Sequence, residues 1–339
     1  MFVKSCWMHP SDLDGSREHL ENVFSRLAKH GFSKVFLFVK NSDGTVIFRT
    51  RNLEVHSTMS DLDEDPLENA IMIAHDFNIE VHPTFVVFCE GNWRGLEVPS
   101  EPGVWLSKNL GLAQCDRKGE PILRWADPAK AEVRRHEAEL ILEVIKNYDV
   151  DGIQLDYIRY PEEAEGCFCD YCRKTFKELH GIDPREVTRP DENMSKWVQW
   201  RAWNITSFVE ELRLEVKREN ARVKLSAAVF KDYPRCLITV AQDWPLWIKK
   251  GMIDFVCPMT YEYDSKVARY LAKNHRAAAG NEAIIYEGLG KKSSQSILTP
   301  REVLEQAEIF KEEGANGVAI FSYSSLNDED LKNLDELGN

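Results

Sequence analysis

The sequence lacks any apolar run long enough to cross a membrane. A transmembrane helix needs about 20 consecutive, mainly apolar residues, and polar or charged residues interrupt every apolar run of this chain well before that length. The first residues, Met1 to Trp7, also lack the apolar core of about 7–15 residues that a secretory signal carries. These absences predict a cytoplasmic protein that has no membrane partner.

Positive charge is in short supply. The chain has 43 Lys and Arg against 56 Asp and Glu, which gives a formal net charge of −13 at pH 7. Because binding to a phosphate backbone needs clustered Lys and Arg, we expect no nucleic-acid partner. A neutral carbohydrate ligand suits this balance, and the 9 Trp, 10 Tyr and 16 Phe supply flat rings for the core and for stacking on sugar faces.

Two groups of cofactor motifs are missing. No Gly-x-Gly-x-x-Gly or phosphate-loop sequence follows an early strand-like run, which argues against a nucleotide-binding sheet. No His-x-His or paired Asp/His set follows those runs, which argues against a metal-dependent hydrolase such as a carbohydrate deacetylase. We therefore expect that catalysis by this chain requires no cofactor.

Strand-like apolar runs alternate with amphipathic helical patterns along almost the whole chain. Eight strand–helix units in a chain of 339 residues predict the α/β class and one (β/α)8 barrel domain over residues 1–339. A doubly wound open sheet is the alternative, disfavoured by the missing nucleotide motifs. The strand-like runs are Val3–Met8, Lys34–Val39, Glu80–Phe88, Gly152–Ile158, Val223–Val229, Asp254–Tyr261, Ala283–Glu287 and Gly317–Phe321.

The predicted helices carry start and stop signals. Asp65 and Thr299 are N-cap residues, each followed by Pro and, three residues after the cap, by Glu. Asp127 followed by Pro predicts the start of another helix, while Gly31 and Gly314 mark helix ends.

Two connections are longer than the others. Residues of about 90–123, after the third predicted strand, are rich in Gly, Pro and Trp, and residues of about 162–193 follow the fourth strand. We predict that both insertions form loops over the C-terminal face of the barrel, because the loops at that face build the site in such enzymes. A long helix should follow from Ser195 to about Glu219.

The segment 150–161, Val-Asp-Gly-Ile-Gln-Leu-Asp-Tyr-Ile-Arg-Tyr-Pro, is the most informative of the chain. Its alternation puts Gln154 and Asp156 on one face of a strand and apolar residues on the other. The polar face should point into the barrel, with Asp156 at the catalytic rim. Asp151 begins the strand at the opposite, structural end, so we interpret it as a turn or capping residue.

Asp151-Gly-Ile-Gln-Leu-Asp156 with Arg159-Tyr-Pro161 resembles the hallmark of the glycosyl-hydrolase-like family 10 proteins, and the similarity covers roughly the whole chain. The resemblance implies a (β/α)8 fold and hydrolysis of a glycosidic bond in an oligosaccharide or glycoconjugate. Other pieces that agree, in the same order, are Asp65-Pro66-Leu67, Val81-His82-Pro83, Trp125-Ala-Asp-Pro128, Gln242-Asp-Trp244 and Pro258-Met-Thr-Tyr261.

Glycoside hydrolysis generally needs two carboxyl groups, one ionised and one protonated. Asp156 is the first candidate, as nucleophile or base, and a nearby Arg159 should favour its charged form. Glu262 and Glu287, near the ends of later strand-like runs, are the candidates for the general acid. A carboxyl separation of about 5–5.5 Å would predict retention and about 6.5–9.5 Å inversion. A structural Asp156–Arg159 pair is the alternative. Further acids beyond strand ends are Asp232 and Asp264.

Several aromatic and polar side chains are candidates for sugar contacts, through stacking or hydrogen bonds to hydroxyls. His82 has a core histidine as its alternative interpretation, and Lys231 has a solvated lysine. The candidates for substrate binding are Arg159, Tyr160, Tyr261, His82, Trp93, Trp105, Trp125 and Lys231.

Cys167, Cys169 and Cys172 form the only close cluster among the 8 cysteines. Three thiols at this spacing suit a structural zinc site, with Asp170, His180 or a cysteine from another loop as the fourth ligand. A second Cys-x-x-Cys pair is absent, so a thiol-rich insertion that merely packs over the site is the alternative.

The sequence therefore predicts a metal-independent glycoside hydrolase that uses paired carboxylates. Its alternatives are a glycan-binding barrel without turnover and a metal-dependent carbohydrate deacetylase. The sequence indicates neither the sugar nor the oligomeric state.

Overall fold

The computed structural model describes residues 2–13, 16–52, 57, 64–92, 101–188 and 192–338. Its centre is a sheet of eight parallel strands in the order β10-β9-β8-β3-β2-β1-β12-β11. Bridges from Val256 to Ile285 and from Met259 to Gly288 join the two edge strands, so the barrel is nearly closed. The barrel strands are β1 (Val3–Met8), β2 (Phe32–Lys40), β3 (Glu80–Val86), β8 (Gly152–Asp156), β9 (Lys224–Val229), β10 (Phe255–Pro258), β11 (Tyr286–Gly290) and β12 (Gly317–Phe321).

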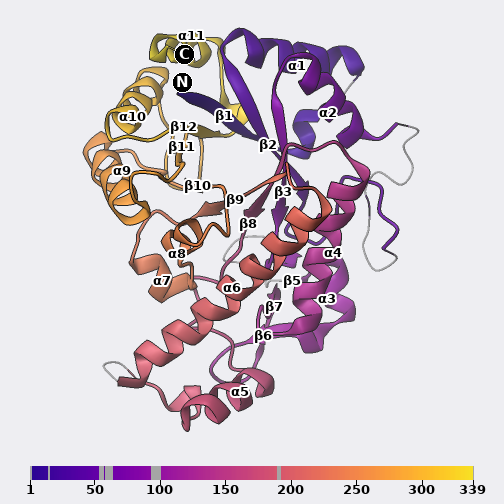
Figure 1. The fold of residues 1–339 in the computed structure, drawn as a ribbon, viewed down its shortest axis with the longest axis vertical. Coiled ribbons are helices and arrows are strands. Elements are labelled where there is room, and N and C mark those ends of the chain that lie inside the picture. Colours follow the sequence, from indigo (N-terminus) through magenta and orange to yellow (C-terminus); the bar gives the residue numbers. More distant parts are fainter. Residues whose placement is uncertain are drawn as a thin grey trace.

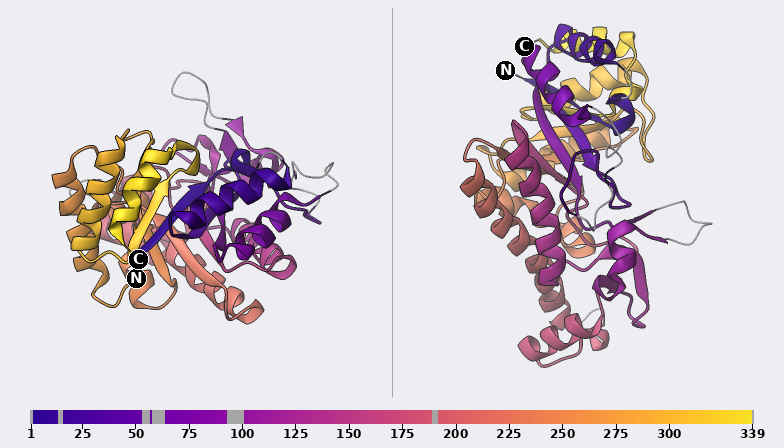
Figure 2. Two further views of the ribbon diagram at one scale, coloured as in Figure 1. Left: turned by 90° about the horizontal axis from the view of Figure 1, so that it is seen from above. Right: turned by 90° about the vertical axis from the view of Figure 1, so that its right-hand side faces the viewer.

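Helices surround the strands, and the two ends of the chain lie side by side at one end of the barrel (Figures 1 and 2). No helix in the described ranges combines the length and the apolar content that a membrane span needs. The helices are α1 (Arg17–Lys29), α2 (Pro66–Asp76), α3 (Val104–Lys108), α4 (Ala131–Asn147), α5 (Asp170–His180), α6 (Glu192–Glu219), α7 (Arg235–Val240), α8 (Trp244–Lys249), α9 (Ser265–Ala279), α10 (Pro300–Glu312) and α11 (Asp328–Leu334), with short 3-10 turns at Pro10–Leu13, Leu110–Leu112, Pro184–Glu186, Tyr323–Ser325 and Asp335–Leu337.

The predicted (β/α)8 class is confirmed, and two of the predicted helix starts hold at atomic level. The Asp65 carboxylate accepts the backbone N–H groups of Leu67 and Glu68. Thr299 and Glu302 form a reciprocal capping box at the start of α10. The start predicted at Asp127 is wrong, because α4 begins at Ala131. The Asp127 side chain instead holds the turn ahead of the helix, where its Oδ1 accepts from the N–H of Ala129 at 3.1 Å.

The end of the barrel where the strands begin is filled by a polar cluster. The His82 ring, which is fully buried, lies 3.0 Å from Glu80 Oε2 and 3.1 Å from Lys34 Nζ. A Cβ atom at Gly152 would lie 2.2 Å from His82 Nδ1, so only glycine fits at the start of β8. Asp151 accepts the N–H of Val81 at 2.8 Å and lies 2.9 Å from His75 Nε2, which joins β3, β8 and α2 at this end.

The two long insertions extend beyond the carboxyl ends of the barrel strands, in the lower part of Figure 1. The first forms two small antiparallel sheets, which pair β4 (Gly91–Asn92) with β5 (Glu101–Pro102) and β6 (Ala113–Cys115) with β7 (Pro121–Ala126). The second carries α5 and leads into the long helix α6, which runs back along the barrel (Figure 1).

Candidate active site

Strand β8 points its polar residues into the barrel. The indole N–H of Trp7 on β1 donates to Gln154 Oε1 at 2.6 Å, and Gln154 Nε2 donates to Cys257 Sγ on β10 at 3.4 Å. These contacts cross the barrel interior, so Gln154 points inward. Side chains two residues apart lie on the same face of a strand, and Asp156 therefore points inward as well. Asp156, the last residue of β8, therefore lies at the carboxyl end of the strand with its side chain toward the mouth.

The backbone turns sharply directly after Asp156. Tyr157 has φ +50°, in the left-handed region that non-glycine residues seldom occupy. Its N–H donates to Asp156 Oδ1 at 2.7 Å, so the turn orients the carboxyl group. Strained residues of this kind cluster at functional sites because the surrounding structure must maintain them.

Burial sets the protonation of Asp156. Removal from water raises the pKa of this carboxyl to about 6, although the Tyr157 N–H and the Arg159 charge both lower it in part. Arg159 therefore favours the charged form, as expected, but burial has the larger effect. A carboxyl group with this pKa can give or take a proton near neutral pH.

A pocket of about 470 Å³ opens at the mouth of the barrel and includes Asp156. Most of its wall comes from the carboxyl ends of the strands and the residues that follow them, as expected for a barrel enzyme. The described residues that line it are Trp7, His9, Phe38, Asn41, Ser42, Val86, Asp156, Tyr157, Arg159, Glu162, Ala228, Phe230, Lys231, Asp232, Met259, Tyr261, Ser293, Ser294, Gln295 and Phe321.

Aromatic rings cover much of this wall. The rings of His9 and Phe38 stack at 5.1 Å, and Phe321 lies against Tyr261 at 5.6 Å. The guanidinium of Arg159 lies 4.5 Å from the ring centre of Phe230, 4.7 Å from that of Tyr157 and 5.0 Å from that of Trp125. Rings combined with a held cation suit the apolar faces and hydroxyl groups of a sugar.

Lys231 brings a second positive charge to the pocket. Its ammonium donates to Glu262 Oε1 at 2.6 Å, to the carbonyl of Tyr261 at 2.9 Å and to Gln295 Oε1 at 2.8 Å. The structure thus places Glu262 behind Lys231, outside the pocket lining. Among the described residues, the carboxylates that do line the pocket with Asp156 are those of Glu162 and Asp232.

Glu287 lies on the outer side of the barrel wall. Its carboxylate accepts from Thr260 Oγ1 at 2.7 Å and is 2.9 Å from Nδ1 of His275 on α9. The side chain is 1% exposed and is directed toward the helix layer. The structure therefore does not bring Glu287 together with Asp156 at the mouth.

The predicted sugar-binding residues are dispersed. Arg159, Tyr261 and Lys231 line the pocket, whereas His82 belongs to the polar cluster at the other end of the barrel. The remaining tyrosine and tryptophans lie as follows: Tyr160 is buried with its Oη accepting from Asn204 at 3.2 Å, Trp125 lies beneath Arg159, Trp105 is buried elsewhere, and Trp93 lies outside the described residues.

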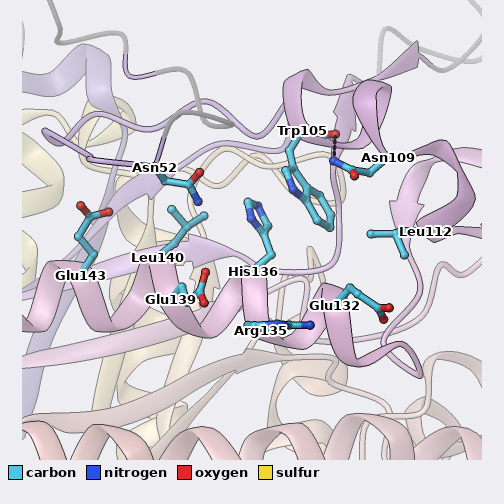
Figure 3. A pocket seen from close by; sticks show the side chains of 10 residues that line it. All are labelled: Asn52, Trp105, Asn109, Leu112, Glu132, Arg135, His136, Glu139, Leu140 and Glu143. Atoms are coloured by element: carbon cyan, nitrogen blue, oxygen red, sulfur yellow. Dashed lines mark hydrogen bonds between the residues drawn. The ribbon is translucent and has the colours of Figure 1, made fainter.

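Trp105 belongs to a separate hollow over helix α4. Its ring lies 3.8 Å from that of His136 and is parallel to it within 3°. Figure 3 shows this pair together with Glu132, Arg135 and the other residues around a pocket of about 650 Å³. Because this hollow lies on the helix layer and not at the strand ends, we do not assign catalysis to it.

Sequence reasoning missed much of the aromatic wall, including Trp7, His9, Phe38, Phe230 and Phe321. Each of these residues lies at or near the carboxyl end of a strand-like run that the sequence did predict. Applying the barrel rule to all eight strand ends, instead of to the fourth one alone, would have identified them.

The three clustered cysteines meet Asp127, a residue not predicted as their partner. Asp127 Oδ2 lies 3.0 Å from Cys172 Sγ, 3.2 Å from Cys167 Sγ and 3.4 Å from Cys169 Sγ. Two of the predicted fourth ligands lie elsewhere, since Asp170 is an exposed partner of Arg173 and the His180 ring packs on Phe176 at 4.5 Å. Cys115, a cysteine of the other insertion, lies beside the cluster with its N–H donating to Cys167 Sγ at 3.4 Å, but the residue grouped with the three thiols is Asp127. Asp127 could have been found in the Trp125–Pro128 segment, which the sequence already singled out.

Comparison with known proteins agrees with this architecture. The profile of the family described as glycosyl hydrolase-like 10 matches residues 4–293. The S-layer-related protein of Niallia circulans is 26% identical over 256 residues, which are 64% of this chain and 16% of that protein. Glycosyl hydrolase DigH of Escherichia coli is 23% identical over 273 residues, which are 72% of this chain and 58% of that protein. The match thus spans less than two thirds of the length of either relative.

The fold also recurs among solved structures. The glycoside hydrolase domain of PgaB (BpsB) from Bordetella bronchiseptica superposes with a TM-score of 0.72 at 14% identity, over 99% of this chain and 98% of that one. Identity this low shows the shared barrel alone.

Proposed function

The chain belongs to the glycosyl hydrolase-like 10 family, and we propose on that premise that it hydrolyses a glycosidic bond in an oligosaccharide or glycoconjugate within the pocket at the mouth of the barrel. The observation that carries the proposal is Asp156. This carboxyl ends β8, is held by a strained turn, and faces a pocket lined with aromatic rings. Curated relatives named glycosyl hydrolase support the reaction class.

Asp156 is best suited to the role of general acid. Burial raises its pKa to about 6, so a substantial share of the carboxyl stays protonated in mildly acidic solution and can protonate the leaving oxygen. This role differs from the nucleophile or base expected from the sequence. The difference arises because the turn and the pocket wall exclude water from the carboxyl.

The partner carboxylate should face both water and substrate. Asp232 is the first candidate, because it lines the pocket just beyond the end of β9, the strand that pairs directly with β8. Glu162, which leads out of the same loop as Arg159, is the second. Both are exposed, which suits a base that activates water or a nucleophile that attacks the sugar. Glu262 and Glu287 are less suited, since Lys231 and His275 hold their carboxylates outside the pocket lining.

A panel of α- and β-linked aryl glycosides and reducing-end assays on oligosaccharides test the proposal. We expect turnover of at least one substrate. Asp156→Asn should abolish it, and so should removal of one of the two candidate partners, Asp232 or Glu162. Lys266→Arg, at the exposed start of α9 and outside the pocket, should retain it. For a general acid of pKa about 6, activity should fall as pH rises above that value; a fall below it would assign Asp156 as base or nucleophile.

Two other outcomes distinguish the rival functions. Saturable glycan binding without turnover of any glycoside would favour a glycan-binding barrel. Release of acetate without release of a reducing end would favour a deacetylase. Either result would overturn the glycosidase proposal.

A further inference from the structure

The cluster of Cys167, Cys169, Cys172 and Asp127 lies apart from the proposed active site. We propose that these four side chains bind one Zn²⁺ ion in a closed structural site. Each offers one ligand atom, and all four atoms lie within 4.8 Å of one another. Three sulfur atoms and one oxygen form a donor set that zinc accepts with tetrahedral geometry.

The spacing of these atoms fits a metal at their centre. Zn–S bonds of about 2.3 Å and a Zn–O bond of about 2.1 Å put sulfur and oxygen about 3.6 Å apart across a tetrahedron. The observed distances from Asp127 Oδ2 to the three Sγ atoms are 3.0, 3.2 and 3.4 Å. The observed separations are shorter than this value by about 0.2–0.6 Å, so an ion at the centre requires only a small outward shift of the ligand atoms.

Hydrogen bonding alone explains this arrangement poorly. One carboxylate oxygen with two lone pairs faces three thiols, which are weak donors. Asp127, Cys167 and Cys172 are each 0% exposed and Cys169 is 9% exposed, so water contributes little. A buried carboxylate among sulfur atoms needs a cation close by. The charge of Lys130 acts on all four groups from a distance, but its ammonium donates to the carbonyl of Gly111 and makes no ion pair with Asp127.

The other buried cluster of metal-binding residue types shows the contrast. Glu90, His136 and Glu137 also bring their ligand atoms within 4.8 Å of one another. There, however, the ammonium of Lys40 forms ion pairs with both glutamates, at 3.1 Å from Glu137. That cluster holds a cation in direct contact with its carboxylates, whereas among the described residues no ammonium or guanidinium forms an ion pair with Asp127.

Backbone contacts around the cysteine cluster orient the proposed ligands. The N–H of Ala129 holds Asp127 Oδ1 at 3.1 Å, which leaves Oδ2 directed toward the sulfurs. The N–H of Cys115 donates to Cys167 Sγ at 3.4 Å. Such outer contacts fix ligand orientation in metal sites. Four protein ligands leave no open position, so the ion would stabilise structure without entering the chemistry.

The ion would join two insertions that are distant in sequence. Asp127 directly follows β7 of the first insertion, while the cysteines lie 40 to 45 positions later, at the start of α5 in the second. The hydrogen bond from the N–H of Phe168 to the carbonyl of Cys115 at 2.9 Å lies at the same junction. Zinc would therefore fasten together the two segments that extend beyond the barrel mouth.

Metal analysis of the full chain, purified without chelator, tests the inference directly. We expect about one zinc per chain by mass spectrometry, and uptake of Co²⁺ by the metal-depleted, reduced protein with the absorption of cobalt–thiolate bonds. Cys172→Ser and Asp127→Asn should each lose the metal. Cys236→Ser, a buried thiol outside the cluster that contacts the carbonyl of Gln242, should retain it.

Wild-type protein that carries no metal and takes up neither Zn²⁺ nor Co²⁺ when reduced would overturn the inference, whether or not the variants fold. Stoichiometric iron or copper would overturn the assignment to zinc. The test is independent of the proposed hydrolysis, because chelation below the unfolding temperature should leave glycosidase turnover unchanged.

Discussion

The mouth of the barrel and the cysteine cluster are each built around one buried aspartate at or just beyond the end of a strand. Burial raises the pKa of Asp156 and of Asp127 to about 6 in both places. The surroundings differ: Asp156 faces an open pocket, whereas Asp127 faces three sulfur atoms in a closed interior. A perturbed carboxyl group therefore does not identify catalysis by itself; access for a substrate distinguishes the two regions.

Exchange of Asp156 for Asn should separate the roles of the two aspartates most clearly. We expect the kcat of the Asp156→Asn variant to fall by about 10²–10⁴-fold, because the proton donor is lost while the pocket keeps its shape. Substrate binding, measured by calorimetry or by protection against thermal unfolding, should persist. Asp127→Asn is the control, and turnover per folded molecule should stay near the wild-type value. Equal losses in both variants would contradict the division of roles.

Removal of a cysteine of the cluster should lower stability, whereas Asp156→Asn should lower turnover. A structural ion contributes to folding free energy, so Cys172→Ser should lower the melting temperature by about 5–10 °C. Scanning calorimetry with and without chelator measures the effect, and Cys236→Ser serves as the matched thiol-to-hydroxyl control. An unchanged melting temperature after verified removal of the metal would argue against a fastening role.

The pH dependence of stability should report the burial of Asp156. An unfolded aspartate titrates near 3.9, and the folded pKa is about 6, so the folded protein binds more protons between these values. The contribution of this group to stability therefore decreases as pH rises from about 4 to 6, by up to about 3 kcal/mol. Urea unfolding at several pH values should show the Asp156→Asn variant gaining stability relative to wild type over this window. Equal pH dependence of the unfolding free energy in the two proteins would contradict a raised pKa of Asp156.

A smaller effect should follow from Arg159→Lys. The guanidinium lies over the rings of Phe230 and Tyr157 and partly offsets the burial of Asp156, and lysine reproduces the charge without the planar stacking. We expect kcat/KM to fall by roughly tenfold. This corresponds to a loss of about 1.4 kcal/mol, the size expected for the cation–π and positioning contacts of the guanidinium. Lys266→Arg, at the exposed start of α9, is a control in which no change is expected.

Much of the fold can be predicted from local sequence patterns. The runs Val3–Met8 and Gly317–Phe321 coincide with β1 and β12, because apolar runs between turn signals mark the buried strands of a parallel barrel. The helix start at Asp127 was wrong for a local reason as well. Its side chain accepts the N–H two residues later, as an N-cap does, but the chain continues as a turn and the helix begins only at Ala131. The same bond leaves Oδ2 of Asp127 directed toward the cysteines.

Less of the candidate active site can be predicted in this way. The alternation along β8 placed Asp156 correctly, whereas Glu262 and Glu287 were chosen for their nearness to strand ends. One residue along a strand exchanges the barrel interior for the helix layer, and β11 directs Glu287 toward His275. Sequence alone could not supply that register for every strand.

By itself, the sequence determined the parallel eight-strand architecture, the position of Asp156 at a strand end and the three thiols near one another. These features depend on periodicity and on short spacings, which local chain geometry transmits directly. Only the tertiary structure decided that Asp232 and Glu162 share a pocket with Asp156, and that Asp127 completes the cysteine cluster. Asp232 is distant in sequence from Asp156, and Asp127 is distant from the cysteines. Closure of the barrel and packing of its insertions bring these side chains within reach of one another.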